Sequence, residues 1–271
     1  MLTFPMKTLQ WGLIPEESFK FKSADDDPYL QNIENNHESE LIFFIQSLMG
    51  SDYSFESFLD IGANLGLKCI PASLFFKNAF AVEANSKVFE YLKENIALNQ
   101  RKNIHSLNIA CGSESKKVKF NQNSAWGHVD LLGEDINCLS LNDLCDEINI
   151  TRINFCKIDV EGYESKILTN FDFTRAQIDL LWVEFNSWCL LAFGGSNPEE
   201  FLRYLTDRYL FVGQIMKIEN DVLEVKSLNS ENYKAFLYEH IFQNGCVDDL
   251  LLVSDKEIFE LIQKNYKLMI V

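Results

Sequence analysis

Two acidic residues and the glycine turn between them have the types and spacing of a ligand-binding site. Asp60 ends an apolar run, and the turn that follows it contains Gly62 and Gly66. Glu83 ends the next apolar run, 21 positions after Gly62. A glycine turn permits a sharp corner into a helix, whose free N–H groups favour a carboxylate or a phosphate. Because an acid about 20 positions further on commonly binds ribose hydroxyls, the pattern predicts a nucleoside-sized pocket at the ends of two parallel strands.

The spacing of the glycines separates the candidate ligands. A dinucleotide-binding turn has the pattern G-x-G-x-x-G, but Asn64 occupies the place of its second glycine, which disfavours nicotinamide and flavin cofactors. Asp60 would repel a pyrophosphate, whereas it suits a sulfonium cation or an amine. S-adenosylmethionine therefore fits, with its amino-acid end at the turn and its ribose diol at Glu83.

Alternating strands and helices must position these residues. The apolar periodicity predicts main strands at 57–61, 79–83, 104–111, 153–160, 178–185, 210–218 and 247–254. It predicts helices at 38–49, 65–76, 86–99, 161–171, from 198 onward, at 230–242 and at 255–264. Short strands at 117–121 and 128–132 and a helical segment at 139–148 fill an insertion. This alternation indicates an α/β fold with a mostly parallel central sheet flanked by helices.

The N-terminal part of the chain has a different character. Residues 1–33 are polar and aromatic without a clear period, which predicts an irregular arm that serves as a lid or a dimer contact. With the helix at 38–49, which Gly50 would stop, they form an N-terminal helical arm, 1–50, on a domain that spans 51–271. The sequence leaves open whether the protein forms a homo-oligomer.

Composition excludes several classes of partner. The 271 residues have a net charge of −16, which argues against nucleic acid and anionic membrane surfaces. No apolar run approaches the length that spans a membrane, and the N-terminus lacks a signal-peptide pattern. The seven cysteines form no C-x-x-C pair, which indicates a reducing, cytoplasmic setting.

Several motifs together resemble the FkbM family of S-adenosylmethionine-dependent methyltransferases. They lie at 59–66, 82–85, 95–99, 108–112 and, most specifically, 157–164. The resemblance implies a Rossmann-like class I methyltransferase fold and cofactor contacts from Asp60, Gly62, Asn64 and Glu83. It also implies that Ala110 and Cys111 lie near the adenine. The family is associated with O-methylation of sugars, glycans and specialised metabolites, so we expect a small-molecule or glycan acceptor.

The acids at 159–164 are the candidates for catalysis. Asp159 is predicted to act as a base or as an electrostatic partner of the sulfonium, and Glu161 to assist it. The alternative is that both only cap the following helix, where Glu164 is expected to be structural. His128 is a further candidate base, against the simpler interpretation of a surface histidine. A Mg²⁺ ion held by Asp159, Glu161 and Glu184 is left open.

Three functions of other classes are alternatives to an O-methyltransferase. A catalytically silent adenosyl-binding or scaffold protein would keep the fold without turnover. An aminopropyl transferase of the spermidine synthase type uses a related cofactor, and an acidic site would suit a polyamine. A nucleic-acid N-methyltransferase is disfavoured by the charge and by the lack of an Asn/Asp-Pro-Pro-aromatic string.

Overall fold

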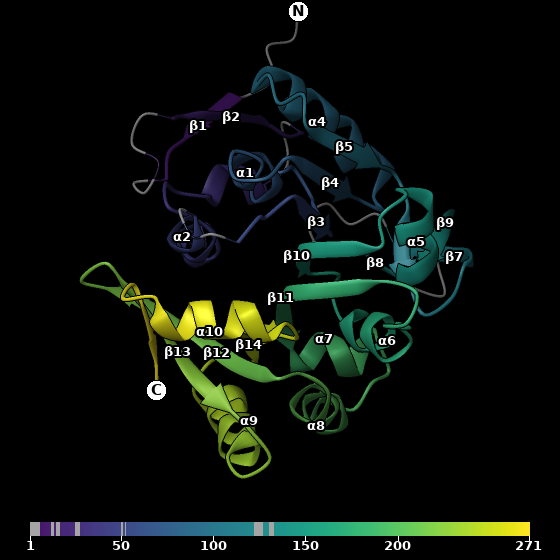
Figure 1. Cartoon of the computed structure of the whole chain (residues 1–271). Coiled ribbons are helices and arrows are strands. Elements are labelled where there is room, and N and C mark those ends of the chain that lie inside the picture. The colour runs from purple at the N-terminus through teal and green to yellow at the C-terminus, as the bar shows by residue number, and fades with distance from the viewer. Residues whose placement is uncertain are drawn as a thin grey trace, which may run out of the picture.

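A large β-sheet forms the centre of the molecule (Figure 1). The computed structural model describes residues 6–11, 14, 17–24, 28–49, 51, 53–121, 127–129 and 133–271. Within these residues the sheet has nine strands, in the spatial order β15 (Leu268–Ile270), β13 (Val222–Leu228), β12 (Phe211–Glu219), β14 (Val247–Val253), β11 (Gln177–Asn186), β10 (Arg152–Ile158), β3 (Ser57–Ile61), β4 (Asn78–Val82) and β5 (Ile104–Leu107).

Strand direction divides this sheet into two parts. Neighbouring strands are parallel from β5 through β4, β3 and β10 to β11. β14 is antiparallel to both of its neighbours, β11 and β12, so β12 runs in the same direction as the parallel set. The predicted α/β, Rossmann-like class I arrangement is confirmed. Two additional strands, β13 and β15, extend the sheet beyond β12 and were not predicted.

Helices cover both faces of the sheet because each strand alternates its side chains between two hydrophobic clusters. One cluster holds Phe58 and Phe155 and is covered by α2 (Ser39–Leu48), α3 (Cys69–Ala72), α4 (Ser86–Leu98) and α10 (Lys256–Lys264). The other holds Leu59 and Cys156 and is covered by α5 (Leu141–Glu147), α6 (Glu164–Thr169), α7 (Ser187–Ala192), α8 (Pro198–Arg208) and α9 (Tyr233–Phe242). Within the described residues, no helix is long and apolar enough to cross a membrane.

The N-terminal arm is more regular than its sequence suggests, which corrects the prediction of an irregular segment. β1 (Met6–Leu9) and β2 (Phe19–Lys22) form an antiparallel pair, and α1 (Pro28–Asn32) follows. The side-chain amide of Asn95, on α4, accepts from the backbone N–H of Lys22 at 2.7 Å and donates to its carbonyl at 3.1 Å. Because Trp11 and Phe19 are fully buried in the same cluster as Phe58, the arm is part of the core. Residues 1–5, 12, 13, 15, 16 and 25–27 of the arm, and Gly50, lie outside the described residues.

Two other predicted elements differ from the structure, and one strand was not predicted. The strand predicted at 104–111 breaks at Asn108, whose Nδ2 donates to the carbonyl of Glu83 at 2.8 Å. Its second half, β6 (Ala110–Gly112), enters a small separate sheet in the order β6, β9 (Glu134–Ser140), β7 (Lys116–Asn121) and β8 (His128–Val129). β9 was not predicted, and α3 is much shorter than the helix predicted at 65–76. Residues 130–132 of the predicted strand 128–132 lie outside the described residues.

Candidate active site

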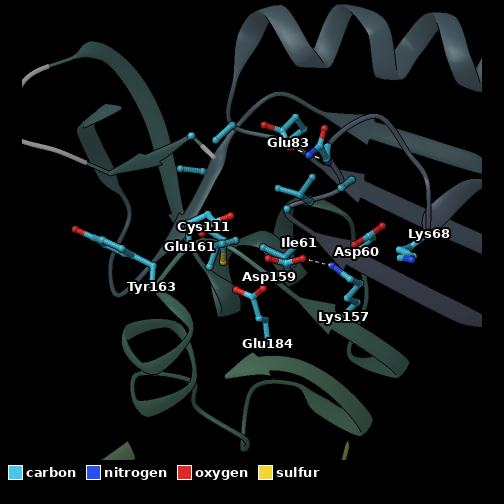
Figure 2. Close-up of a pocket in the computed structure, with 18 of the residues that line it drawn as sticks. Asp60, Ile61, Lys68, Glu83, Cys111, Lys157, Asp159, Glu161, Tyr163 and Glu184 are labelled. Atoms are coloured by element: carbon cyan, nitrogen blue, oxygen red, sulfur yellow. Dashed lines mark hydrogen bonds and ion pairs between the residues drawn. The ribbon is translucent and has the colours of Figure 1, made fainter. Parts of the chain in front are cut away.

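A cavity of about 200 Å³ lies at the carboxyl ends of β3, β4, β10 and β11 (Figure 2). In open α/β sheets these strand ends are where ligands bind. The small sheet closes one side through Ala110, Cys111 and Phe120, and the N-terminal arm closes another through Tyr29 and Glu38. The charged side chains of its lining are mostly acidic: Glu38, Asp60, Glu83, Asp159, Glu161 and Glu184, with Lys68 and Lys157.

The structure brings most of the predicted cofactor residues together. Six of the seven line this one cavity: Asp60, Gly62, Asn64, Glu83, Ala110 and Cys111. Gly66 is not among its lining residues. It has a φ of +87°, and a Cβ at this position would lie 2.8 Å from Ile70 Cδ1 and 2.9 Å from Leu92 Cδ1. Gly66 therefore permits close packing of the turn against α3 and α4, away from the cavity.

Asp60 is a buried carboxylate whose charge has no hydrogen-bonding partner. It is only 1% exposed, and within the described residues neither of its carboxylate oxygens finds a donor. Burial raises the pKa of this side chain to about 6, against the effect of the nearby Lys157 ammonium. A buried carboxylate without a partner is costly, so a cation bound in the cavity would satisfy it. This side chain fits the sulfonium or ammonium group of S-adenosylmethionine.

Glu83 is held by the backbone on both sides of the cavity corner. Its Oε2 accepts from the N–H of Asn64 at 2.8 Å and its Oε1 from the N–H of Asn85 at 2.7 Å. Burial raises the pKa of Glu83 to about 7, although these two hydrogen bonds favour the charged form. Each oxygen can accept a further hydrogen bond, so a ribose diol could bind the same carboxylate.

Close packing requires a glycine at position 62, for a reason that the sequence did not show. Its φ is +86°, and a Cβ here would lie 1.8 Å from the carbonyl oxygen of Asp159. The glycine was expected to let the backbone approach a ligand. The structure shows that it lets the end of β3 approach the end of β10, which places Asp60 beside the acids that follow β10.

The acids after β10 have different environments. Lys157 Nζ donates to Asp159 Oδ2 at 2.7 Å. Burial alone would lower the pKa of Lys157, but the carboxylates around it, Asp159 foremost, raise it well above its usual value. The Lys157 ammonium is therefore charged at neutral pH, and its hydrogen bond fixes the position of Asp159.

Glu161 has the more unusual backbone conformation. Its φ is +54°, in the left-handed region that costs a non-glycine residue about 1–2 kcal/mol. Burial first, and the charge of Asp159 second, raise the pKa of Glu161 to about 7. The Cys189 thiol donates to its Oε2 at 3.3 Å. The strained turn therefore directs a carboxylate that titrates near neutrality into the cavity.

Hydrogen bonds to the turn before α6 give Glu164 a structural role. Glu164 Oε1 accepts from the backbone N–H of Val160 at 2.8 Å and of Gly162 at 3.3 Å. Glu164 is fully buried, as expected for a structural residue. Because this side chain satisfies the turn before α6, the interpretation of Asp159 and Glu161 as simple helix caps has no support in these contacts.

The comparison with known families agrees with this site. The family model of the methyltransferase FkbM domain matches residues 60–211, more than half of the 271 residues. The chain belongs to the FkbM methyltransferase family. It is a methyltransferase whose methyl donor is S-adenosylmethionine. No protein of curated function matches it at significant similarity.

Three solved methyltransferases are similar in fold to this FkbM methyltransferase. The precorrin-6y C5,15-methyltransferase of Geobacter metallireducens GS-15 is 14% identical with a TM-score of 0.45, over 87% of this chain and 94% of that one. The METTL16 methyltransferase domain is 16% identical with a TM-score of 0.48, over 89% and 76%. An rRNA methylase from Streptococcus thermophilus is 10% identical with a TM-score of 0.45, over 80% and 95%.

Glu184, on β11, also lines the cavity. Burial and the neighbouring carboxylates, Asp159 first, raise the pKa of Glu184 well above its usual value. Its neighbour across the β11–β14 pair is Asp249, whose pKa burial raises to about 7. Across the described part of the chain, no group of three or more His, Cys, Asp or Glu side chains is arranged to hold a metal ion. Asp159, Glu161 and Glu184 thus do not form a ready metal site in this structure.

His128 lies beside the FkbM cavity without lining it. Its imidazole ring stacks on Phe193, with ring centroids 3.7 Å apart and planes 19° from parallel. Its neighbour Gly127 does line the cavity, and Trp126 lies outside the described residues. His128 is therefore outside the set of residues that line the cavity, which includes Asp159 and Glu161.

The lining residues that the sequence reasoning missed include Tyr29, Glu38 and Lys68. Tyr29 comes from the segment 1–33, which had no clear period. Glu38 begins the helix predicted at 38–49, but no pattern indicated that it faces the cavity. Lys68 is two residues beyond the glycine turn and is only 6% exposed. A lysine in an otherwise apolar segment, Leu65 to Ala72, was the one available signal for it.

Proposed function

We propose that this FkbM methyltransferase methylates a hydroxyl oxygen of a small-molecule or glycan acceptor, a sugar, a glycan or a specialised metabolite. The observation that carries this proposal is Glu161. A hydroxyl must lose its proton when it is methylated, and a general base works best with a pKa near the operating pH. The pKa of Glu161, raised to about 7, meets that requirement in the same cavity as Asp60.

The proposed orientation of the cofactor follows the lining residues. S-adenosylmethionine supplies an electrophilic methyl group on a sulfonium cation. Ala110 and Cys111 would lie against the adenine, and Glu83 would accept from the ribose hydroxyls. Asp60 would bind the cationic amino-acid end, which removes the cost of its unpartnered charge. This places the acceptor near Asp159, Glu161 and Glu184.

The two acids after β10, Asp159 and Glu161, would then have different roles in methyl transfer to the acceptor. Glu161 takes and holds the hydroxyl proton, and Lys157 holds the Asp159 side chain in a fixed position facing the cation. Positioning supplies the larger part of the rate, since correct orientation can be worth ~7–11 kcal/mol. The choice of Glu161 as the base differs from the sequence-based preference for Asp159, because Asp159 is already paired with Lys157.

The charge of the chain supports an acceptor other than nucleic acid. The net charge is −16, and the cavity lining has six carboxylates and two lysines. Neutralising phosphates requires basic surface. Carboxylates are instead hydrogen-bond acceptors for the hydroxyls of a polyol.

An acceptor screen tests this function. The protein is incubated with S-adenosylmethionine and separate panels of sugars and glycosides, glycolipids, phenolic metabolites, amines and RNA, and formation of S-adenosylhomocysteine is measured. We expect turnover with a hydroxyl acceptor and a new O-methyl signal in the NMR spectrum of the product. Turnover confined to amines or RNA would contradict the proposal.

A variant then tests the proposed base on the acceptor found. Glu161→Gln should lower kcat by ~10²–10⁴-fold with little change in KM, since it removes a proton acceptor but keeps the shape. The wild-type rate should rise with pH through about 7, where Glu161 loses its proton. Glu199→Gln, an exposed change in the first turn of α8, is the matched control and should behave as wild type. Full turnover in Glu161→Gln would show that another group takes the proton.

A further inference from the structure

Lys68 is a buried ammonium that the arm holds in place beside the cavity. Its Nζ donates to the His37 carbonyl at 2.8 Å and lies 2.8 Å from Glu38 Oε2. Its side chain is 7% exposed, whereas that of Glu38 is 49% exposed. A buried charge is stable only when it is paired, and the partners of Lys68 both belong to the segment before α2. The arm therefore fixes a positive charge in the wall of the cavity.

The position of Lys68 matches one end of the cofactor. Figure 2 shows Asp60 and Lys68 at one end of the cavity and Cys111 toward the other, with Glu83 between them. With the adenine at Cys111 and the ribose at Glu83, the amino-acid end lies at Asp60 and Lys68. An α-amino acid carries an ammonium and a carboxylate, so it needs one anionic and one cationic partner. Asp60 supplies the unpartnered anion, and Lys68 supplies the cation.

Lys157 is the other lysine that lines the cavity, and its setting is different. It extends from β10 and is bonded to Asp159 at 2.7 Å on the side where the acceptor is proposed to bind. The side chain of Glu38 is 49% exposed and that of Asp159 is 31% exposed, so solvent screens the charge beside Lys68 more than the charge beside Lys157. Lys68 is thus the better partner for a carboxylate at the Asp60 end.

We propose that Lys68, held by Glu38 and the His37 carbonyl, binds the carboxylate of S-adenosylmethionine and makes the enzyme selective for the carboxylated donor. The inference rests on the cofactor orientation proposed above and is independent of the acceptor. By positioning Lys68, the N-terminal arm would contribute to cofactor binding. This selectivity also separates this enzyme from aminopropyl transferases, whose donor is decarboxylated S-adenosylmethionine.

Two ligands that differ only in the carboxylate test the proposal. The purified protein is titrated calorimetrically with S-adenosylhomocysteine and with its decarboxylated analogue, S-adenosyl-3-thiopropylamine. We expect the wild type to bind S-adenosylhomocysteine at least tenfold more tightly. Lys68→Met should remove that preference, with at least a tenfold loss for S-adenosylhomocysteine and less than a twofold change for the analogue. Lys157→Met should keep the preference, and the exposed control Lys87→Met should match the wild type for both ligands.

Three outcomes would overturn the assignment of Lys68. They are equal affinity of the wild type for the two ligands, an equal loss for both ligands in Lys68→Met, and loss of the preference in Lys157→Met instead. If circular dichroism shows that Lys68→Met does not fold, the ratio of the wild-type affinities for the two ligands and the Lys68→Gln variant test the same assignment. Failure of the wild type to bind S-adenosylhomocysteine at all would instead contradict the cofactor orientation on which the inference rests.

Discussion

Glu83 Oε2 accepts a 2.8 Å hydrogen bond from the backbone N–H of Asn64, so the acid that follows β4 is bonded to the turn that follows β3. The second carboxylate oxygen accepts from the N–H of Asn85 at 2.7 Å. The side chain expected to bind the ribose is thus also a structural link between two strand ends. Its removal should affect the stability of the protein as well as its affinity for the cofactor.

Glu83→Ala should lower the free energy of unfolding by about 1–3 kcal/mol, because it leaves two backbone N–H groups beside the cavity without their acceptors. Urea denaturation of the protein without ligand measures this. Glu90→Ala, on the exposed face of α4, removes a carboxylate of a surface ion pair and should change stability by less than about 0.5 kcal/mol. Equal effects of the two changes would show that the hydrogen bonds of Glu83 do not stabilise the corner.

Asp60→Asn should have opposite effects on stability and on binding. At pH 8 the ionised Asp60 is buried without a partner, so the neutral amide should raise the melting temperature of the free protein. The same change removes the negative charge proposed to bind the amino-acid end, and affinity for S-adenosylhomocysteine should fall at least tenfold. Thermal melts with and without ligand measure both effects. A variant that is less stable and binds normally would contradict this role.

Gly62→Ala should destabilise the fold by more than about 3 kcal/mol, because the new Cβ would overlap the Asp159 carbonyl and the residue has a positive φ. Gly195→Ala is the control: its φ is also positive, at +59°, but no heavy atom lies within 4 Å of the added Cβ. It should cost only ~1–2 kcal/mol, the price of the left-handed conformation alone. Similar losses in the free energy of unfolding, measured by urea denaturation, would show that the close contact between the ends of β3 and β10 does not make Gly62→Ala more destabilising.

Stability should fall as the pH rises from about 5 to 8. Burial raises the pKa of Asp60 to about 6 and raises to about 7 the pKa values of Glu83, Glu161, Glu164 and Asp249. In the unfolded chain these groups titrate near 4, so between about pH 4 and 7 the folded state binds more protons. Stability then decreases with pH across that window. Urea denaturation at pH 5.5 and pH 8 measures the difference, and greater stability at pH 8 would contradict it.

Much of the sheet could be predicted because buried parallel strands are continuous apolar runs. The strands predicted at 57–61 and 178–185 agree with β3 and β11. The start of α8 was also predictable, since Asn197 accepts from the N–H groups of Glu199 and Glu200 as its capping pattern requires. Asp60 and Glu83 could be assigned to one pocket because Asp60 lies near the end of β3 and Glu83 directly follows β4, its parallel neighbour.

The parts that were missed depend on contacts between distant residues. Phe19 and Phe21 alternate with lysines in a strand too short to recognise, and the side chain of Asn95, more than 70 positions away, fixes that strand. Asn108 ends β5 through a bond to the Glu83 carbonyl, which no local pattern reveals. Lys68 and Glu38 meet only in the folded chain, so no sequence pattern showed that the arm pairs with Lys68 in the wall of the cavity.

The most direct test of the central claim is a calorimetric titration of the wild type and of Glu83→Gln with S-adenosylhomocysteine. We expect micromolar binding by the wild type and at least a tenfold weaker affinity in Glu83→Gln, since a hydrogen bond to a charged acceptor is worth ~1.5–3 kcal/mol. Glu90→Gln should bind as the wild type does. Absence of binding in the wild type, or an unchanged affinity in Glu83→Gln, would contradict the assignment of this cavity as the S-adenosylmethionine site.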